Sequence, residues 1–189
     1  MRTRKITDRE TLLLAIRSGT RPKYFLFWGH RPLPGNEIGK PCLSQWWPAP
    51  FIVDGVRYPT AEHFMMAEKA RLFGDNVTRA AVLDAANPRA AKQLGRGVRG
   101  FVESHWQDAR YALVVRGNFA KFSQNPVLGQ FLRSTAAQVL VEASPVDRIW
   151  GIGLAADDER AVKPEQWRGL NLLGFALMQV REQLKNSGT

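Results

Sequence analysis

The segment from Tyr58 to Arg71, which reads YPTAEHFMMAEKAR, constrains this chain more than any other. Thr60 is the expected N-cap of a helix, because its hydroxyl can accept hydrogen bonds from free backbone N–H groups. Apolar residues at positions 64, 65, 67 and 70 give this helix a buried side. Glu62 and Lys69 are two helical turns apart, so about 20° separates them around the axis. The carboxylate and the amine therefore face the same way, either as a reactive site or as a solvated surface pair.

A β-hairpin is expected directly before this helix, in the segment Phe51–Tyr58. Asp54-Gly55 suits a two-residue type I′ turn between β-branched and aromatic residues. Two further apolar runs, Tyr24–Trp28 and Val139–Glu142, predict short strands. Helical patterns fill most of the remaining chain, in segments 75–86, 88–95, 103–121 and 126–132. A terminal amphipathic helix is opened by the stretch 167–174 and runs to about position 184. The sequence therefore predicts a mainly α (α+β) fold, a single domain of several helices with a small antiparallel β element.

The N-terminal segment is expected to be an accessory helix. Thr7 to Glu10 spells T-x-x-E, a capping box, and Gly19 suits the end of the helix. Residues 1–20 are accordingly assigned to this helix and residues 21–189 to the main domain. The stretch 29–44 is rich in proline and glycine and predicts a long loop, of the kind that often carries function. Whether this loop closes over a site is left open by the sequence.

The charge and composition limit the class of protein. The formal net charge is +10, which favours an anionic partner such as a phosphorylated metabolite, a nucleotide or a nucleic acid. The single cysteine, Cys42, excludes an internal disulfide framework, and the three histidines lack the spacing of metal ligands. Neither a membrane-spanning run nor a signal-peptide pattern is found. We therefore expect a cytoplasmic protein with no metal and no cofactor.

A second concentrated stretch runs from Asp147 to Gly153 and reads DRIWGIG. Gly151 and Gly153 would let the backbone pass close to a ligand. The stretch is not a dinucleotide fingerprint, because a third glycine and a following helix are missing. Trp106 begins a stripe at helical spacing in the longest predicted helix, and by itself such a tryptophan is more often core than ligand platform.

Taken in chain order, these features resemble the YbiA-like, or NADAR, family of N-glycoside hydrolases. The matching residues are Phe27-Trp28 with the loop to Leu43-Ser44, Tyr58-x-x-x-Glu62-His63-x-x-x-x-x-Lys69-Ala70, Trp106 with Arg116-Gly117-Asn118-x-x-Lys121-Phe122, Asp147-x-x-Trp150-Gly151-Ile152-Gly153, and Trp167-x-Gly169-x-Asn171-x-x-Gly174. Together they extend over residues 24–184. The resemblance implies a YbiA-like catalytic domain over residues 21–189, with departures in the N-terminal helix and in the loop after Trp28.

The resemblance implies hydrolysis of an N-glycosidic bond between a base and a phosphorylated ribose, without a metal. One activity of the family acts on ribosylamino-pyrimidine 5′-phosphates of riboflavin synthesis and releases ribose 5-phosphate. Another removes ADP-ribose from guanine in DNA. The alternative to an enzyme is a non-catalytic module that binds ADP-ribose or another nucleotide. The presence of both Glu62 and Asp147 weighs against this alternative.

The resemblance also implies roles for individual residues. Glu62 and Asp147 would stabilise positive charge on the sugar and activate water. Lys69 would either form a Schiff base with the opened sugar or pair with Glu62 or a phosphate. The remaining expected contacts are to the substrate: Trp106 would stack on the base, and Arg116 or another cation would hold phosphate. The other implied substrate-binding residues are Trp28, His63, Asn118, Trp150, Gly151 and Asn171.

Overall fold

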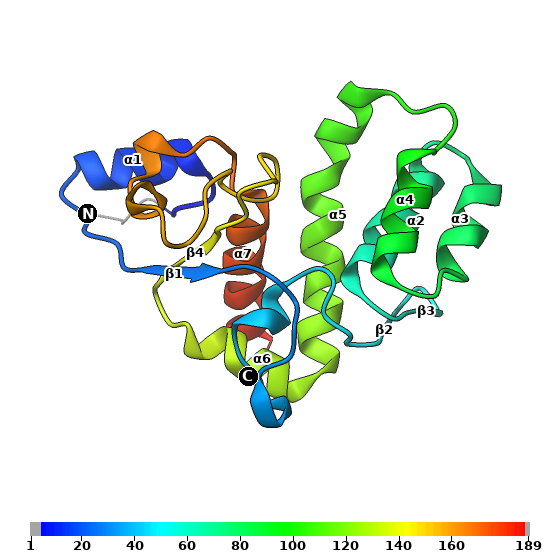
Figure 1. The fold of residues 1–189 in the computed structure, drawn as a ribbon, viewed down its shortest axis with the longest axis horizontal. Helices are drawn as coiled ribbons and strands as arrows, with labels where there is room; N and C mark the ends of the chain where they lie inside the picture. The colour runs from blue at the N-terminus through cyan, green and yellow to red at the C-terminus, as the bar shows by residue number, and fades with distance from the viewer. Residues whose placement is uncertain (1–4, 188–189) are drawn as a thin grey trace. The chain divides into compact units, whose positions relative to one another are not determined.

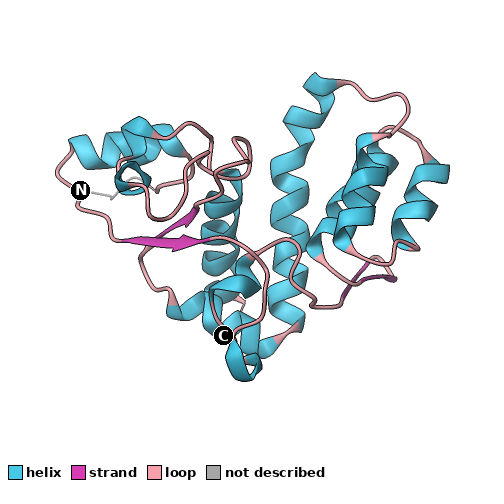
Figure 2. Ribbon diagram, in the orientation of Figure 1, coloured by secondary structure: helices cyan, strands magenta, loops and turns pink. Residues whose placement is uncertain are grey.

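A computed structural model describes residues 5–187 of the chain (Figure 1). It forms two compact units. One contains the residues from Gln45 to Pro126, and the other contains the residues up to Ser44 together with those from Val127 onward. Most of the described chain is helical, and its strands form two short pairs (Figure 2). The predicted mainly α fold with a small β element is therefore confirmed.

The unit Gln45–Pro126 begins with the predicted hairpin. Strands β2 (Phe51–Val53) and β3 (Val56–Tyr58) pair in antiparallel fashion, with Phe51 opposite Tyr58. Asp54 and Gly55 both have positive φ angles, of 50° and 77°, as a type I′ turn requires. The turn prediction is confirmed, and β3 delivers the chain directly to the helix that carries Glu62.

Four helices complete this unit, and α2 lies among the other three (Figure 1). They are α2 (Ala61–Leu72), α3 (Asn76–Leu83), α4 (Pro88–Arg96) and α5 (Glu103–Gln124). Two glycines allow this packing. A Cβ atom at Gly117 of α5 would overlap the ring of Phe64, and one at Gly95 of α4 would overlap Met66. Both Phe64 and Met66 belong to α2, so its neighbours can approach it closely on two sides.

The second unit contains a parallel pair of strands, β1 (Tyr24–Phe27) and β4 (Val139–Glu142). Tyr24 lies opposite Val139 and Phe27 opposite Glu142. Both strands were predicted from the sequence, but the sheet was expected to be antiparallel, and for this pair that was wrong. Parallel strands need a long connection between them, and here more than half of the chain lies between Phe27 and Val139.

The same unit also contains helices and short 3₁₀ turns. They are α1 (Arg9–Arg17), α6 (Pro126–Ser134), α7 (Leu172–Asn186) and the short 3₁₀ turns η1 (Pro34–Asn36), η2 (Lys40–Leu43), η3 (Glu159–Val162) and η4 (Pro164–Gln166). Helix α7 packs against β4. Helix α1 is held by Arg9, whose side chain donates hydrogen bonds to the carbonyls of Pro164 and Glu165, at 2.8 and 3.0 Å.

The N-cap of α1 differs by one residue from the prediction. Asp8 accepts a hydrogen bond from the Thr11 backbone at 2.7 Å, and the Thr11 hydroxyl accepts one from the Asp8 backbone at 3.1 Å. The capping box is therefore Asp8 with Thr11, in place of Thr7 with Glu10, because a carboxylate is the stronger acceptor at this end of a helix. The assignment of residues 1–20 and 21–189 to separate parts stays a prediction, and residues 1–4 lie outside the described chain. Within residues 5–187 no helix is long and apolar enough to cross a membrane.

Candidate active site

Glu62 occupies the first turn of α2 and is fixed there by two neighbours. The Thr60 hydroxyl caps the helix by accepting a hydrogen bond from the His63 backbone at 3.3 Å. The Glu62 backbone N–H donates to the carbonyl of Gln45 at 3.0 Å. The side chain of Glu62 is only 3% exposed. The carboxylate thus starts from a rigid backbone in largely dry surroundings, where its charge acts more strongly than in water.

Lys69 lies two turns further along α2, in a partly buried aromatic environment. Its Nζ atom donates a hydrogen bond to the Gly95 carbonyl at 2.9 Å, and it lies 4.2 Å from the centroid of the Phe101 ring and 5.8 Å from that of Trp106. Burial lowers the pKa of the Lys69 amine, and the charge of Glu103 partly opposes this. A lowered pKa increases the fraction of neutral amine, which is the nucleophilic form.

Trp106 is a buried residue of α5 and lies beside Lys69. Phe101, in the segment just before α5, supplies the nearer of the two rings. Trp106 was predicted from the sequence as a site residue, whereas Phe101 was not, because Phe101 belongs to no recognisable motif. The two rings form an apolar boundary beside the amine and contribute to its burial.

His63 is completely enclosed. A carbonyl oxygen can only accept, so Nε2 carries the proton and donates to the Ala85 carbonyl at 3.0 Å. Nδ1 then accepts from the Thr60 hydroxyl, with 2.8 Å between the two atoms. Burial lowers the pKa of His63, while the hydrogen bond to Ala85 acts in the opposite direction. Both ring nitrogens are thus occupied in holding α2, and a substrate-binding role for His63 stays a prediction.

Asn118 of α5 is linked to the first turn of α2 through Gln45. Its Nδ2 atom donates to the side-chain oxygen of Gln45 at 2.8 Å and to the Val114 carbonyl at 2.9 Å. Asn118 is 0% exposed and Gln45 is 7% exposed. Gln45 was not identified from the sequence as a site residue, since its contacts depend on helices far away along the chain.

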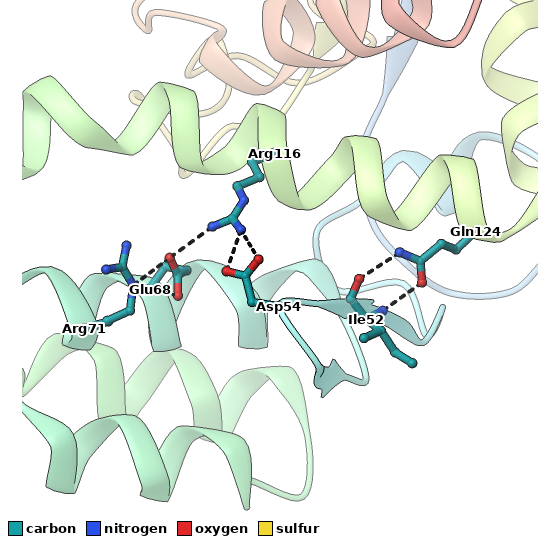
Figure 3. Close-up of polar contacts among 6 residues, drawn as sticks. All are labelled: Ile52, Asp54, Glu68, Arg71, Arg116 and Gln124. Atoms are coloured by element: carbon teal, nitrogen blue, oxygen red, sulfur yellow. Dashed lines mark hydrogen bonds and ion pairs between the residues drawn. The ribbon is translucent and has the colours of Figure 1, made fainter. Parts of the chain in front are cut away.

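Arg116 is shared by two carboxylates. One guanidinium nitrogen donates to both oxygens of Asp54, at 2.6 and 2.7 Å, and the other lies 3.8 Å from Glu68 (Figure 3). Glu68 is buried and also accepts a hydrogen bond from Arg71 at 2.9 Å. These carboxylates raise the pKa of Arg116, above all through the hydrogen bond to Asp54. A phosphate at Arg116 would have to share this cation with Asp54 and Glu68, neither of which was predicted as a site residue.

In the other unit, the loop after β4 is shaped by Asp147. Its Oδ1 atom accepts hydrogen bonds from the backbone N–H groups of Ile149 and Trp150, both at 2.8 Å. A Cβ atom at Gly151 would lie 2.8 Å from the Glu142 carbonyl oxygen and 3.1 Å from that of Asp147. Gly151 is therefore required by close packing of the backbone. Asp147 has a structural task here, and a chemical role for it stays a prediction.

Asn171 ties the start of α7 to the end of β4. Its φ angle is 57°, its Nδ2 atom donates to the Leu140 carbonyl at 2.9 Å, and its Oδ1 atom accepts from the Glu142 backbone at 2.9 Å. The side chain is buried, so its predicted contact with substrate stays untested. Trp28 follows β1 and is largely exposed, whereas Trp150 is half-buried.

The sequence-predicted residues thus fall into two groups. The unit Gln45–Pro126 contains Glu62, His63, Lys69, Trp106, Arg116 and Asn118, and the other unit contains Trp28, Asp147, Trp150, Gly151 and Asn171. The first group includes Glu62, the amine of Lys69 and the ring of Trp106, and the second includes Asp147 and the other two tryptophans. Within residues 5–187 no three His, Cys, Asp or Glu side chains are grouped as metal ligands would be.

Comparison with known proteins identifies the class. The NADAR domain family matches residues 26–185, so the chain belongs to the NADAR domain family. It is 40% identical over 166 residues to N-glycosidase R617 of Acanthamoeba polyphaga mimivirus, covering 85% of this chain and 96% of that protein. This confirms the family resemblance and the expected class of enzyme, a hydrolase acting on N-glycosyl bonds.

Two further relatives extend the comparison. N-glycosidase YbiA of Escherichia coli is 32% identical over 135 residues, covering 71% of this chain and 76% of that protein. Its NMR structure has a TM-score of 0.70 and 26% identity, covering 89% of this chain and 88% of that one. The chain also matches the maize protein named riboflavin biosynthesis protein PYRR, chloroplastic, with 34% identity over 138 residues, which is 69% of this chain but 20% of that protein.

Proposed function

We propose that this protein hydrolyses the N-glycosidic bond of a ribosylamino-pyrimidine 5′-phosphate and releases ribose 5-phosphate. The observation that carries the proposal is Lys69, an amine of lowered pKa on the same helix as the buried carboxylate of Glu62. The choice of a pyrimidine intermediate is supported by the name of the maize relative. A phosphorylated substrate also suits a chain of net charge +10.

Cleavage of the bond builds positive charge on the sugar, as in other glycoside hydrolyses. Glu62 is proposed to stabilise this charge and to activate water, since its backbone is fixed by Thr60 and Gln45. Asp147 is proposed as the second carboxylate through Oδ2, because Oδ1 is occupied by the backbone. Trp106 is proposed to stack on the base and Arg116 to bind phosphate, and the proposed substrate contacts also include Trp28, His63, Asn118, Trp150, Gly151 and Asn171.

Lys69 is proposed to act covalently. Its neutral Nζ atom adds to C1 of the ring-opened imine and passes one proton to the base nitrogen. The bond from C1 to the base nitrogen then breaks as Nζ gives up its second proton, so the base leaves as a free amine and Nζ is joined to C1 as an imine. Water then adds to the resulting imine and releases the aldehyde of ribose 5-phosphate and the free amine. Borohydride added during turnover should reduce the imine and leave a stable adduct on Lys69. Absence of an adduct in a protein that turns over would leave Lys69 the role of pairing with Glu62 or with phosphate.

The test of the substrate is release of ribose 5-phosphate by purified protein without added metal. The substrate is a ribosylamino-pyrimidine 5′-phosphate, and a blank without protein corrects for spontaneous decay. Release above the blank that is lost in Glu62→Ala supports the proposal. Release that is equal in Glu62→Ala, or no release at all, contradicts it.

Removal of ADP-ribose from guanine in DNA is the second candidate, and the basic flank of α4 favours it. Arg89, Lys92 and Arg96 fall within an arc of about 60° on this helix. The surrounding stretch 85–102 contains no acidic residue. Among residues 5–187 none of the three forms an ion pair with a carboxylate. A row of unpaired cations is what binding to a phosphate backbone uses.

Salt dependence separates the two candidates. If α4 contacts three phosphates of a DNA duplex, replacing Arg89, Lys92 and Arg96 with Gln should reduce the slope of log K against log salt by about 3. The matched control is replacement of three exposed basic residues of the other unit, Arg21, Lys23 and Arg31. If both variants lose the same amount of slope, the effect comes from net charge and not from contacts of α4 with DNA. Restoration of plain guanine in ADP-ribosylated DNA, abolished in Glu62→Ala, would establish the second activity.

A further inference from the structure

Gln45 is the residue that connects the two helices of the candidate site within the unit Gln45–Pro126. Its carbonyl accepts from the Glu62 backbone at 3.0 Å, and its side-chain oxygen accepts from Asn118 at 2.8 Å. Glu62 lies in α2 and Asn118 lies in α5. One residue outside any helix thus contacts both the turn that carries the proposed carboxylate, through its backbone carbonyl, and an amide proposed to contact substrate, through its side chain.

The orientation of the Asn118 amide depends on this contact. Both hydrogens of Nδ2 are used, one by Gln45 and one by the Val114 carbonyl. The Oδ1 atom is buried and accepts no hydrogen bond within residues 5–187. Rotating the amide by half a turn would place Oδ1 against two acceptors and lose both bonds. The acceptors on Gln45 and Val114 together decide which way the amide points, and of the two only the one on Gln45 belongs to a side chain.

Burial makes the link rigid. Gln45, Glu62 and Asn118 are all buried, so water cannot replace the lost partner if one of them is changed. Gly117, the neighbour of Asn118 on α5, lies against Phe64 of α2, so the two helices are already in close contact here. A change of the Gln45 side chain is consequently transmitted to Asn118, with little room for compensation where α5 meets α2.

We infer that Gln45 is a positioning residue for the hydrolysis, holding Glu62 and Asn118 in the arrangement that the reaction requires. This inference rests on the proposed function. Gln45 touches neither the sugar nor the base in this account. It acts through its backbone on Glu62 and through its side chain on Asn118, so only the second of these links can be removed by substitution.

The test compares Gln45→Leu, which removes the acceptor, with Gln45→Glu, which keeps an oxygen toward Asn118. Gln45→Leu should lower kcat by about tenfold or more with KM changed by less than about twofold, while Gln45→Glu recovers most of the rate. Asn118→Leu should resemble Gln45→Leu, and the double variant should be no slower than either, because the two residues act as one unit. Gln93→Leu, at an exposed position of α4, is the matched control.

The outcomes are distinguishable. If the wild-type protein turns over and Gln45→Leu has the same kcat, the inference is overturned while the proposed function stands. The inference is also overturned if Gln45→Leu lowers kcat, Gln45→Glu does not restore it, and the effect adds to that of Asn118→Leu. The loss of kcat then comes from packing. If the wild-type protein releases no product from either substrate, the proposed function itself fails, and the positioning role in that reaction fails with it.

Discussion

Lys69 and Phe101 form the closest contact between a cation and an aromatic ring at the candidate site, with 4.2 Å from Nζ to the ring centroid. The ring shields the amine from water, and burial is the main cause of its lowered pKa. A free lysine on a surface helix would stay protonated at neutral pH. Lys69 thus lies in a partly buried aromatic environment and not on an open surface, and a reactive role for its amine stays a prediction.

The first prediction concerns the pH dependence of the rate. If neutral Lys69 is the nucleophile, kcat should rise with pH through the lowered pKa of its amine. Phe101→Ala admits water, so that pKa should move back toward its ordinary value, and the rising limb should shift to higher pH. Profiles of kcat against pH for the two proteins measure this, with Phe131→Ala in the other unit as control. If the rising part of the profile stays at the same pH in Phe101→Ala, deprotonation of Lys69 does not control the rate.

The second prediction concerns Arg116. Loss of a charge-assisted hydrogen bond to phosphate costs about 1.5–3 kcal/mol, so Arg116→Gln should raise KM by about tenfold or more. Asp54 is largely exposed, so Asp54→Asn should change the free energy of unfolding by less than about 1 kcal/mol and should not raise KM. Arg57→Gln on the same hairpin is the control. If Arg116→Gln lowers only the unfolding temperature, the guanidinium serves solely to join the hairpin to α2 and α5.

The third prediction concerns the contact between α2 and α5. A methyl group at Gly117 would overlap the Phe64 ring, and overpacking of this kind costs about 1–3 kcal/mol. Gly117→Ala should therefore lower the urea midpoint. At Gly97 the nearest atom to a new Cβ is the Leu94 carbonyl oxygen at 3.5 Å, so Gly97→Ala should have little effect. Equal stability of the two variants would show that α5 does not pack on α2 as described.

The fourth prediction concerns acid stability. The pKa of His63 is lowered in the folded state, so the unfolded chain binds the proton more tightly. The stability that neutral His63 provides is present above its unfolded pKa of about 6.5 and is lost as pH falls from there through the folded pKa. His63→Gln should lower the unfolding temperature at pH 7. Below pH 6.5 the unfolding temperature of this variant should decrease less steeply with falling pH than that of the wild type. Exposed His105→Gln should leave the slope unchanged, and an unchanged slope in His63→Gln would contradict the assignment.

Local patterns predicted much of this fold. Asp54-Gly55 indicated the hairpin because only residues tolerant of positive φ fit its turn. Thr60 and Asn87 indicated the starts of α2 and α4, and each accepts the expected backbone hydrogen bond. The parallel pairing of β1 with β4 could not be predicted in the same way. It joins residues more than a hundred positions apart, and nothing local distinguishes it from antiparallel pairing.

At the candidate site, too, local patterns could be predicted from the sequence and long-range contacts could not. Glu62 and Lys69 were found because helical periodicity places them on one face. Phe101, Gln45 and Glu68 were missed, because their importance comes from contacts with segments that only the folded chain brings near. His63 is bonded to the Ala85 carbonyl and the Thr60 hydroxyl, and Asn171 to the backbone of β4, so both have a structural task. Their expected contacts with substrate stay predictions.

The most direct test of the account is the rate of ribose 5-phosphate release by the wild-type protein and by Glu62→Gln. Glutamine keeps the shape of the side chain but can neither carry the charge nor take a proton, and such losses amount to about 10²–10⁴-fold. We predict a fall of about 10²-fold or more in kcat, with an unfolding temperature close to that of the wild type. Equal rates in the two proteins would contradict the claim that the Glu62 carboxylate performs the hydrolysis.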